Sequence, residues 1–304
     1  MKPNLKVKIR DLEFKNPVIT ASGTFGYGLE YSQFVDLNRL GGIVVKGLSL
    51  YPKEGNPPPR IYETPCGMIN SIGLQNIGYE VFIKEKLPVL KKFDTNVIVN
   101  FFGENLSEYI EIALKLDSTD GIHALEMNVS CPNKNSEWRQ MGIDPKLLAQ
   151  AVKEVRKRIS KPLIIKLSPQ VTDISLMAKI CEEEGADAVS LINTIPAMVI
   201  DIKTRRSLIG TLTGGLSGPA IRPVALRAVW EVAKAVNIPV IGMGGITSAE
   251  DALQFIIAGA TLVAVGTANF INPITTIEVI EGIEKFLVEE TIEDIKELIG
   301  KLNE

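Results

Sequence analysis

The chain has 304 residues, of which 45% are hydrophobic and 23% charged, and its formal net charge is −3 at pH 7. This composition is ordinary for a globular enzyme, and the length allows a large core without disulfides or metals. The slight acidity argues against the basic surface of a nucleic-acid-binding protein and against a polybasic membrane patch.

The three cysteines, Cys66, Cys131 and Cys181, are odd in number and widely spaced. This pattern fits neither a disulfide framework nor a zinc site, and it is typical of a reducing cytosol. Residues 1–8 are charged and lack the apolar core of a signal peptide, and no stretch is apolar for long enough to span a bilayer. We therefore expect a cytoplasmic protein that binds neither membranes nor nucleic acid.

Short β-branched runs alternate with longer helical patterns along the chain. The runs are almost continuously apolar, as in parallel strands that are buried on both faces. The expected strands are residues 17–21, 43–46, 96–101, 124–130, 162–168, 188–193, 239–242 and 262–266. Helical periodicity marks residues 106–116, 145–159, 174–184, 219–236 and 249–257. Eight strands joined by helices predict one (β/α)8 (TIM) barrel domain over residues 1–304.

Several segments depart from this alternation. Residues 4–14 predict an N-terminal hairpin that closes the bottom of the barrel. Residues of about 50–74, 131–143 and 194–217 follow strands, so they predict insertions on the C-terminal face, where barrel active sites lie. The last of them predicts a hairpin that pairs residues 199–202 with 208–209. The amphipathic stretch 274–302 predicts one or two helices on the outside of the barrel.

Polar residues or glycines stand where the expected strands end. They are Ser22, Lys46, Gly47, Asn100, Asn128, Lys166, Asn193, Thr194, Gly244, Gly245, Gly266 and Thr267. A polar group in an apolar strand is costly to bury without a partner, and any one of these could be a satisfied core residue. So many at the same end of successive strands predict a polar pocket at the barrel mouth.

Glycine-rich segments close the last two strands, GMGGI at 242–246 and VGTA at 265–268. In barrels these two strand ends commonly bind phosphate. Glycines let backbone N–H groups approach an anion, and a helix N-terminus adds a favourable field. The segment GGLSG at 214–218 could supply further N–H donors. Together they predict a phosphorylated cofactor or substrate.

Two lysines are expected in the same pocket. Lys166 stands inside an apolar strand, so a solvent position is not expected, whereas Lys46 at a strand end could point to solvent. A reduced flavin carries negative charge on its pyrimidine edge, and a fixed lysine there would stabilise it. The two cations therefore favour an anionic ligand of this kind.

Cys131 is the candidate base. Most lone cysteines are inert core residues, which is how we interpret Cys66 and Cys181. Cys131 instead follows strand four in an accessible loop near cations, which favour the reactive thiolate. The polar loop at 134–141 is long enough to act as a lid. His123, the only histidine, begins strand four at its other end and is interpreted as structural, which excludes a Ser-His-Asp triad and a multi-histidine metal site.

Five segments together resemble the class 1 dihydroorotate dehydrogenases of pyrimidine biosynthesis, and the similarity spans essentially the whole chain. They are NSIGLQN at 70–76, NVSCPN at 128–133, IKLSP at 165–169, INT at 192–194 and GGLSG at 214–218. RIYET at 60–64, leading to GMIN at 67–70, is similar to the class 1B, NAD-linked catalytic subunits rather than to the fumarate-linked class 1A enzymes.

The resemblance implies one FMN per chain and dihydroorotate as substrate. It implies cofactor contacts from Ser22, Lys46, Gly47, Asn100, Asn128, Lys166, Ile192, Gly218, Gly244, Gly245, Gly266 and Thr267. It implies substrate contacts from Lys46, Asn70, Ser71, Ile72, Gly73, Leu74, Asn128, Asn193 and Thr194. The implied catalytic residues are Cys131, which would take the proton from C5 while hydride leaves C6 for the flavin, and Lys166.

The class 1B resemblance also implies a second subunit that carries FAD and a 2Fe–2S cluster and passes electrons to NAD. This chain has only three cysteines and no G-x-G-x-x-G segment, so the partner would have to bring both groups. We expect a homodimer of this chain flanked by two partner subunits, a heterotetramer.

Four alternatives remain open at this point. The chain could be a class 1A enzyme that uses fumarate and works alone, or another pyrimidine-reducing flavin barrel. It could also be a flavin-free phosphate-binding barrel, such as an aldolase or isomerase, in which Lys166 forms a Schiff base. A non-enzymatic scaffold fits least, because it would not require polar groups at so many strand ends.

Overall fold

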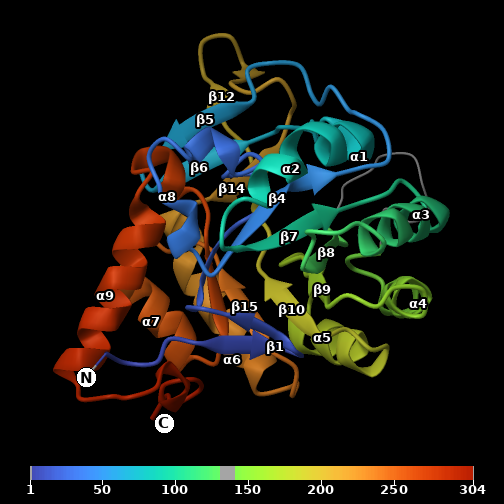
Figure 1. The fold of residues 1–304 in the computed structure, drawn as a ribbon. Helices are drawn as coiled ribbons and strands as arrows, with labels where there is room; N and C mark the ends of the chain where they lie inside the picture. The colour runs from blue at the N-terminus through green and yellow to red at the C-terminus, as the bar shows by residue number, and fades with distance from the viewer. Residues whose placement is uncertain (1, 131–140, 304) are drawn as a thin grey trace.

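The computed structural model describes residues 2–130 and 141–303, and its centre is a closed barrel of eight parallel strands (Figure 1). Around the barrel the strands follow the order β10-β15-β16-β3-β4-β7-β8-β9. Their bounds are β3 Val18–Thr20, β4 Gly42–Leu48, β7 Asn96–Phe101, β8 Ala124–Asn128, β9 Leu163–Lys166, β10 Ala188–Leu191, β15 Val240–Met243 and β16 Leu262–Val265. Each overlaps one expected strand, so the barrel prediction is confirmed.

Helices cover the outside of the barrel. The long ones are α3 Leu106–Asp117, α4 Pro145–Arg156, α5 Ile174–Glu183, α6 Arg222–Ala233, α7 Ala249–Ile257 and α9 Thr275–Glu289. Several begin at a side chain that accepts a backbone N–H of the first turn, as Asn105, Asp144 and Ser248 do. None of the helices in the described part of the chain combines the length and the apolar character needed to cross a membrane.

The connection between β4 and β7 holds short helical pieces that the sequence pattern did not predict. They are α1 Gly78–Val81, the π-helical turn Phe82–Lys86 and α2 Leu87–Leu90, and a further single turn, α8 Ala268–Ile271, follows β16. Pro88 lies in the first turn of α2, where a proline is tolerated because it has no N–H to leave unpaired. These breaks keep any one piece too short to show a clear helical period.

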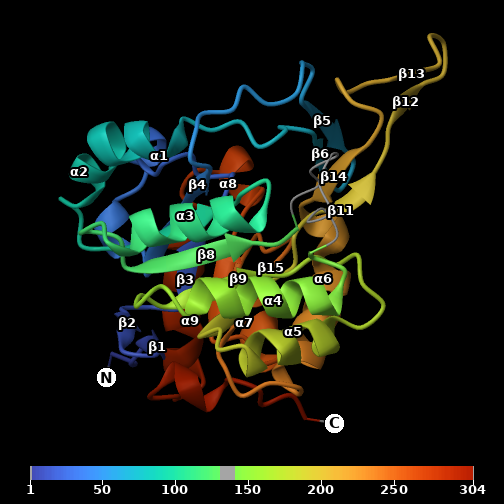
Figure 2. The same cartoon turned by 90° about the vertical axis from the view of Figure 1, so that its right-hand side faces the viewer.

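Two insertions that lie far apart in the sequence join in one sheet above the barrel. Its order is β11-β14-β6-β5, with bounds β11 Ile195–Ala197, β14 Gly214–Ser217, β6 Gly67–Asn70 and β5 Ile61–Thr64. A hairpin of β12 (Ile200–Asp201) and β13 (Arg206–Ser207) projects beyond it (Figure 2). Leu208 N donates to Val199 O at 3.2 Å, so the hairpin expected at 199–209 is confirmed.

The N-terminal hairpin lies at the opposite end of the barrel, near both termini (Figure 1). It pairs β1 Val7–Ile9 with β2 Leu12–Phe14, and both Ile9 and Phe14 are fully buried. This arrangement agrees with a hairpin that closes the bottom. The top of the barrel, where the carboxyl ends of the strands meet, is thereby left for the polar residues.

Candidate active site at the barrel mouth

Lys166 at the end of β9 reaches across the barrel mouth. Its Nζ donates to Ser22 Oγ at 3.0 Å, and Ser22 follows β3, which is four strands from β9 in either direction around the barrel. Lys166 is only 5% exposed, and it forms no ion pair within residues 2–130 and 141–303. A buried ammonium without a counter-ion is costly, so this position suits an anionic ligand.

A cradle of backbone forms where β14, β15 and β16 end. A Cβ on Gly245 would lie 2.8 Å from Gly218 O, and a Cβ on Gly218 would lie 3.6 Å from Thr267 Cγ2. Gly218, Gly244 and Gly245 all have positive φ, at 91°, 133° and 75°. The three glycine-rich segments that were predicted to bind phosphate therefore meet here. Side chains at their glycine positions would fill the space between them. Gly266, beside Thr267, is half-buried at the end of β16.

A buried polar network lies inside the barrel beside this mouth. Asn100 Nδ2 donates to Glu126 Oε2 at 2.6 Å, and Ser190 Oγ donates to Glu126 Oε1 at 2.7 Å. All three residues are at most 1% exposed. A Cβ on Gly47 would lie 2.7 Å from Asn100 Oδ1, so the close approach of β4 and β7 here requires glycine.

Lys46 adds a second cation to the mouth. It is half-buried, and burial lowers the pKa of its ammonium below the usual lysine value. The nearby Arg60 guanidinium lowers this pKa further, and Glu30 opposes the shift. The expectation that Lys46 belongs to a cationic pocket therefore gains support over a solvent position.

Three of the predicted substrate residues lie in the upper sheet or directly before one of its strands. Asn70 ends β6, and its Nδ2 donates to Gly215 O on β14 at 3.3 Å. At the same residue of β14, a Cβ on Gly215 would lie 2.0 Å from Thr194 Oγ1. Asn193 Oδ1 accepts from Thr194 N at 2.8 Å. Two predicted substrate segments are thus joined through one strand.

The turn at 71–74 is held by the preceding insertion. Asn56 N donates to Ile72 O at 3.1 Å, and Ser71 N donates to Arg60 O at 2.8 Å. Gly73 and Leu74 both have positive φ, 73° and 60°. The hydroxyl of Ser71 is buried and forms no hydrogen bond within the described residues. An unpaired buried hydroxyl in this turn is suited to a ligand.

Two further predicted residues flank the mouth. Asn128 ends β8; its side-chain oxygen accepts from Ser130 N at 3.1 Å, and its backbone oxygen accepts from Tyr109 Oη at 2.8 Å. Ile192 follows β10, is 3% exposed, and donates its N–H to Met243 O at 3.0 Å. In register, Lys166 pairs with Asn128 on one side and with Ser190 on the other, so these strand ends are level.

The three cysteines have different surroundings. Cys131 and most of the predicted lid lie outside the described residues, so the role of Cys131 stays a prediction. Cys181 is buried in α5, and burial raises the pKa of its thiol, as expected for an inert core residue. The interpretation of Cys66 as a core residue was wrong: it is exposed, because it lies in the turn that joins β5 to β6.

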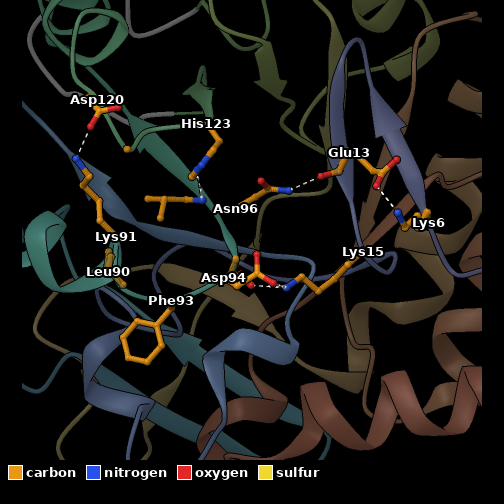
Figure 3. A pocket seen from close by; sticks show the side chains of 13 residues that line it. Lys6, Glu13, Lys15, Leu90, Lys91, Phe93, Asp94, Asn96, Asp120 and His123 are labelled. Atoms are coloured by element: carbon orange, nitrogen blue, oxygen red, sulfur yellow. Dashed lines mark hydrogen bonds and ion pairs between the residues drawn. The ribbon is translucent and has the colours of Figure 1, made fainter.

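A groove of about 530 Å³ lies at the bottom of the barrel, away from these residues (Figure 3). Its lysines Lys6, Lys15 and Lys91 are paired with Glu13, Asp94 and Asp120. His123 lines the same groove and accepts from Val97 N through Nδ1 at 2.9 Å, in keeping with a structural histidine. Desolvation of the ring lowers the His123 pKa. The lysines and carboxylates that line this groove therefore balance each other, whereas the mouth is cationic.

Two residues that support the mouth, Glu126 and Asn56, are not among the predicted site residues. Glu126 could have been singled out from the sequence, because it is a single carboxylate in the otherwise apolar first residues of β8. Asn56 could not be singled out, because it lies in a segment rich in proline and glycine that has no regular pattern of polar and apolar residues. Its hydrogen bonds to the turn at 71–74 depend on tertiary pairing.

Comparison with known proteins agrees with this geometry. The family model described as dihydroorotate dehydrogenase matches residues 4–287. A relative from Thermodesulfovibrio yellowstonii, named dihydroorotate dehydrogenase B (NAD(+)), catalytic subunit, is 79% identical over 302 residues, which are 99% of this chain and 100% of the relative. A Thermoanaerobacter relative of the same name is 57% identical, over 98% of this chain and 99% of its own.

A solved structure supports the fold alone. It is a dihydroorotate dehydrogenase of Eimeria tenella in complex with ferulenol, with a TM-score of 0.80 and 22% identity, covering 98% of this chain and 88% of that one. The barrel, the cationic mouth and the relatives agree with one another. The chain belongs to the dihydroorotate dehydrogenase family and groups there with the B-type, NAD(+)-linked catalytic subunits.

Proposed function

We propose that this chain oxidises (S)-dihydroorotate to orotate in de novo pyrimidine biosynthesis, as the FMN-containing catalytic subunit of an NAD-linked enzyme. The names of its relatives support the reaction. The structural observation that carries the proposal is the buried Lys166, which reaches across the mouth with a hydroxyl as its hydrogen-bond partner. A site of this kind favours a ligand that is or becomes anionic.

The mouth fits FMN at both of its ends. The cradle of Gly218, Gly244 and Gly245, with Gly266 and Thr267, would hold the phosphate through backbone N–H groups. The pyrimidine edge of FMN would be surrounded by Lys166, Lys46, Gly47 and Asn100. The flavin ring would be lined by Ser22, Asn128 and Ile192. Bound FMN would supply the hydride acceptor for the reaction.

The upper sheet and the turn at 71–74 would bind the substrate. Asparagine side chains offer both donors and acceptors, which match the amide-like edges of the dihydroorotate ring. Those edges would form hydrogen bonds with Asn70, Asn128, Asn193 and Thr194. The carboxylate would be bound by Lys46 and by the backbone and hydroxyl of the turn, where Ser71 has an unpaired oxygen. Cys131 would take the proton from C5.

The names of the relatives support a proposal for the assembly and the electron acceptor. We propose a cytoplasmic heterotetramer in which a homodimer of this chain carries FMN. Two partner subunits would carry FAD and a 2Fe–2S cluster and pass electrons to NAD.

Anaerobic mixing of the purified chain with dihydroorotate tests the proposal. Loss of the flavin absorbance near 450 nm is the expected result. Reoxidation by NAD should then require the partner, whereas rapid reoxidation by fumarate would favour a class 1A enzyme. A colourless protein, or a flavin that dihydroorotate does not bleach, would contradict the proposal.

A further inference from the structure

Glu126 is a buried carboxylate with no role in the function proposed above. It lies on β8, is 1% exposed and forms no ion pair within residues 2–130 and 141–303. A buried carboxylate is costly unless hydrogen bonds compensate it. Both of its oxygens do accept such bonds, at 2.6 Å from Asn100 and at 2.7 Å from Ser190.

The carboxylate fixes the direction of the Asn100 amide. An ionised carboxylate only accepts hydrogen bonds, so the group that Asn100 turns toward it must be the NH2. The amide oxygen then points away from Glu126 and lies over Gly47, where a Cβ would be 2.7 Å from it. Gly47 is half-buried and has no side chain of its own that would cover this edge of the amide.

We infer that Glu126 is a positioning residue that makes Asn100 present a hydrogen-bond acceptor, and not a donor, to the bound cofactor. The inference rests on the proposed FMN site, to which Asn100 and Gly47 belong. The flavin pyrimidine ring carries one N–H group, the imide at N3, between two carbonyl oxygens. An acceptor held at Asn100 selects that N–H, whereas a reversed amide would select a carbonyl.

The test compares FMN with 3-methyl-FMN, which lacks the imide N–H. Dissociation constants for the two flavins are measured by flavin fluorescence on the stripped full-length protein, and their ratio is the readout. Glu126→Gln alone is not decisive, because the Ser190 hydroxyl could turn to accept from glutamine and leave Asn100 in place. The decisive variant is E126Q/S190A, and its matched control is S190A, which keeps the carboxylate facing Asn100.

The wild type and S190A should prefer FMN by similar ratios, within about twofold. The preference should fall roughly five- to tenfold in E126Q/S190A, as expected when a hydrogen bond is no longer enforced. Melting temperatures show whether each variant folds, and a general loss of packing would weaken both flavins alike. An unchanged ratio in the double variant, or a full preference retained in Asn100→Ala, overturns the inference.

The outcome is separable from the proposed function. Bleaching of the wild-type flavin by dihydroorotate tests the reaction, and the ratio in the variants tests Glu126. A wild-type chain that binds no FMN would overturn both.

Discussion

Replacing Lys166 by methionine should stabilise the flavin-free protein. Lys166 is 5% exposed, and within residues 2–130 and 141–303 its ammonium has one hydrogen bond, to the half-buried Ser22. Burying an unpaired ion costs several kcal/mol, while the lost bond is worth about 1 kcal/mol. The net gain should be about 1–3 kcal/mol. At roughly 1.5 °C per kcal/mol for a chain of this length, the melting temperature rises by about 2–5 °C.

The same substitution should make the bound flavin harder to reduce. At 4 Å and an effective dielectric of 20, a fixed cation stabilises a new negative charge by about 4 kcal/mol. The oxidised ring is neutral, so the substitution would cost it only a hydrogen bond to Lys166, worth about 1 kcal/mol. The difference of about 3 kcal/mol lowers the two-electron midpoint potential of FMN by roughly 60 mV.

Scanning fluorimetry of the stripped protein and potentiometric titration of the loaded protein measure these two effects. Ser22→Ala is the matched control, because it removes the hydroxyl and keeps the cation, so the potential should change little. A stripped K166M protein that melts below the wild type would refute the burial argument. An unchanged potential would refute the placement of Lys166 beside the flavin.

Three further predictions follow from the surroundings of single residues. Gly67→Ala should destabilise the protein by about 1–3 kcal/mol in urea unfolding, because the new Cβ would lie 2.1 Å from Ser217 O on the paired strand; an unchanged midpoint would contradict this contact. Orotate affinity should fall as the pH rises through the lowered pKa of Lys46, since the anion binds the charged form, and titration of Lys46→Met should lose this dependence. In the folded protein a maleimide should label the exposed Cys66, while Cys181, whose thiol pKa is raised by burial, should react only after unfolding; mass spectrometry of the digested protein distinguishes the two sites.

The barrel could be predicted from the sequence because its signals are local. Apolar runs such as β9 and helical periods such as α4 repeat within short windows, and the structure reproduces both. The clustering of polar residues at the strand ends follows from the closed barrel. The upper sheet could not be predicted, because β6 and β14 are joined by pairs such as Asn70 with Gly215, which lie far apart in the chain. The orientation of Asn100 likewise depends on Glu126, a neighbour in space.

The upper sheet also limits how this enzyme can be re-engineered. Loops on a barrel top are often treated as modules that can be exchanged one at a time between relatives. Here β14 is an inner strand between β11 and β6, so the two insertions share a single hydrogen-bonded unit. Grafting either insertion alone would leave unpaired strand edges over the mouth. A change of substrate preference by loop exchange would have to move residues 50–74 and 194–217 together.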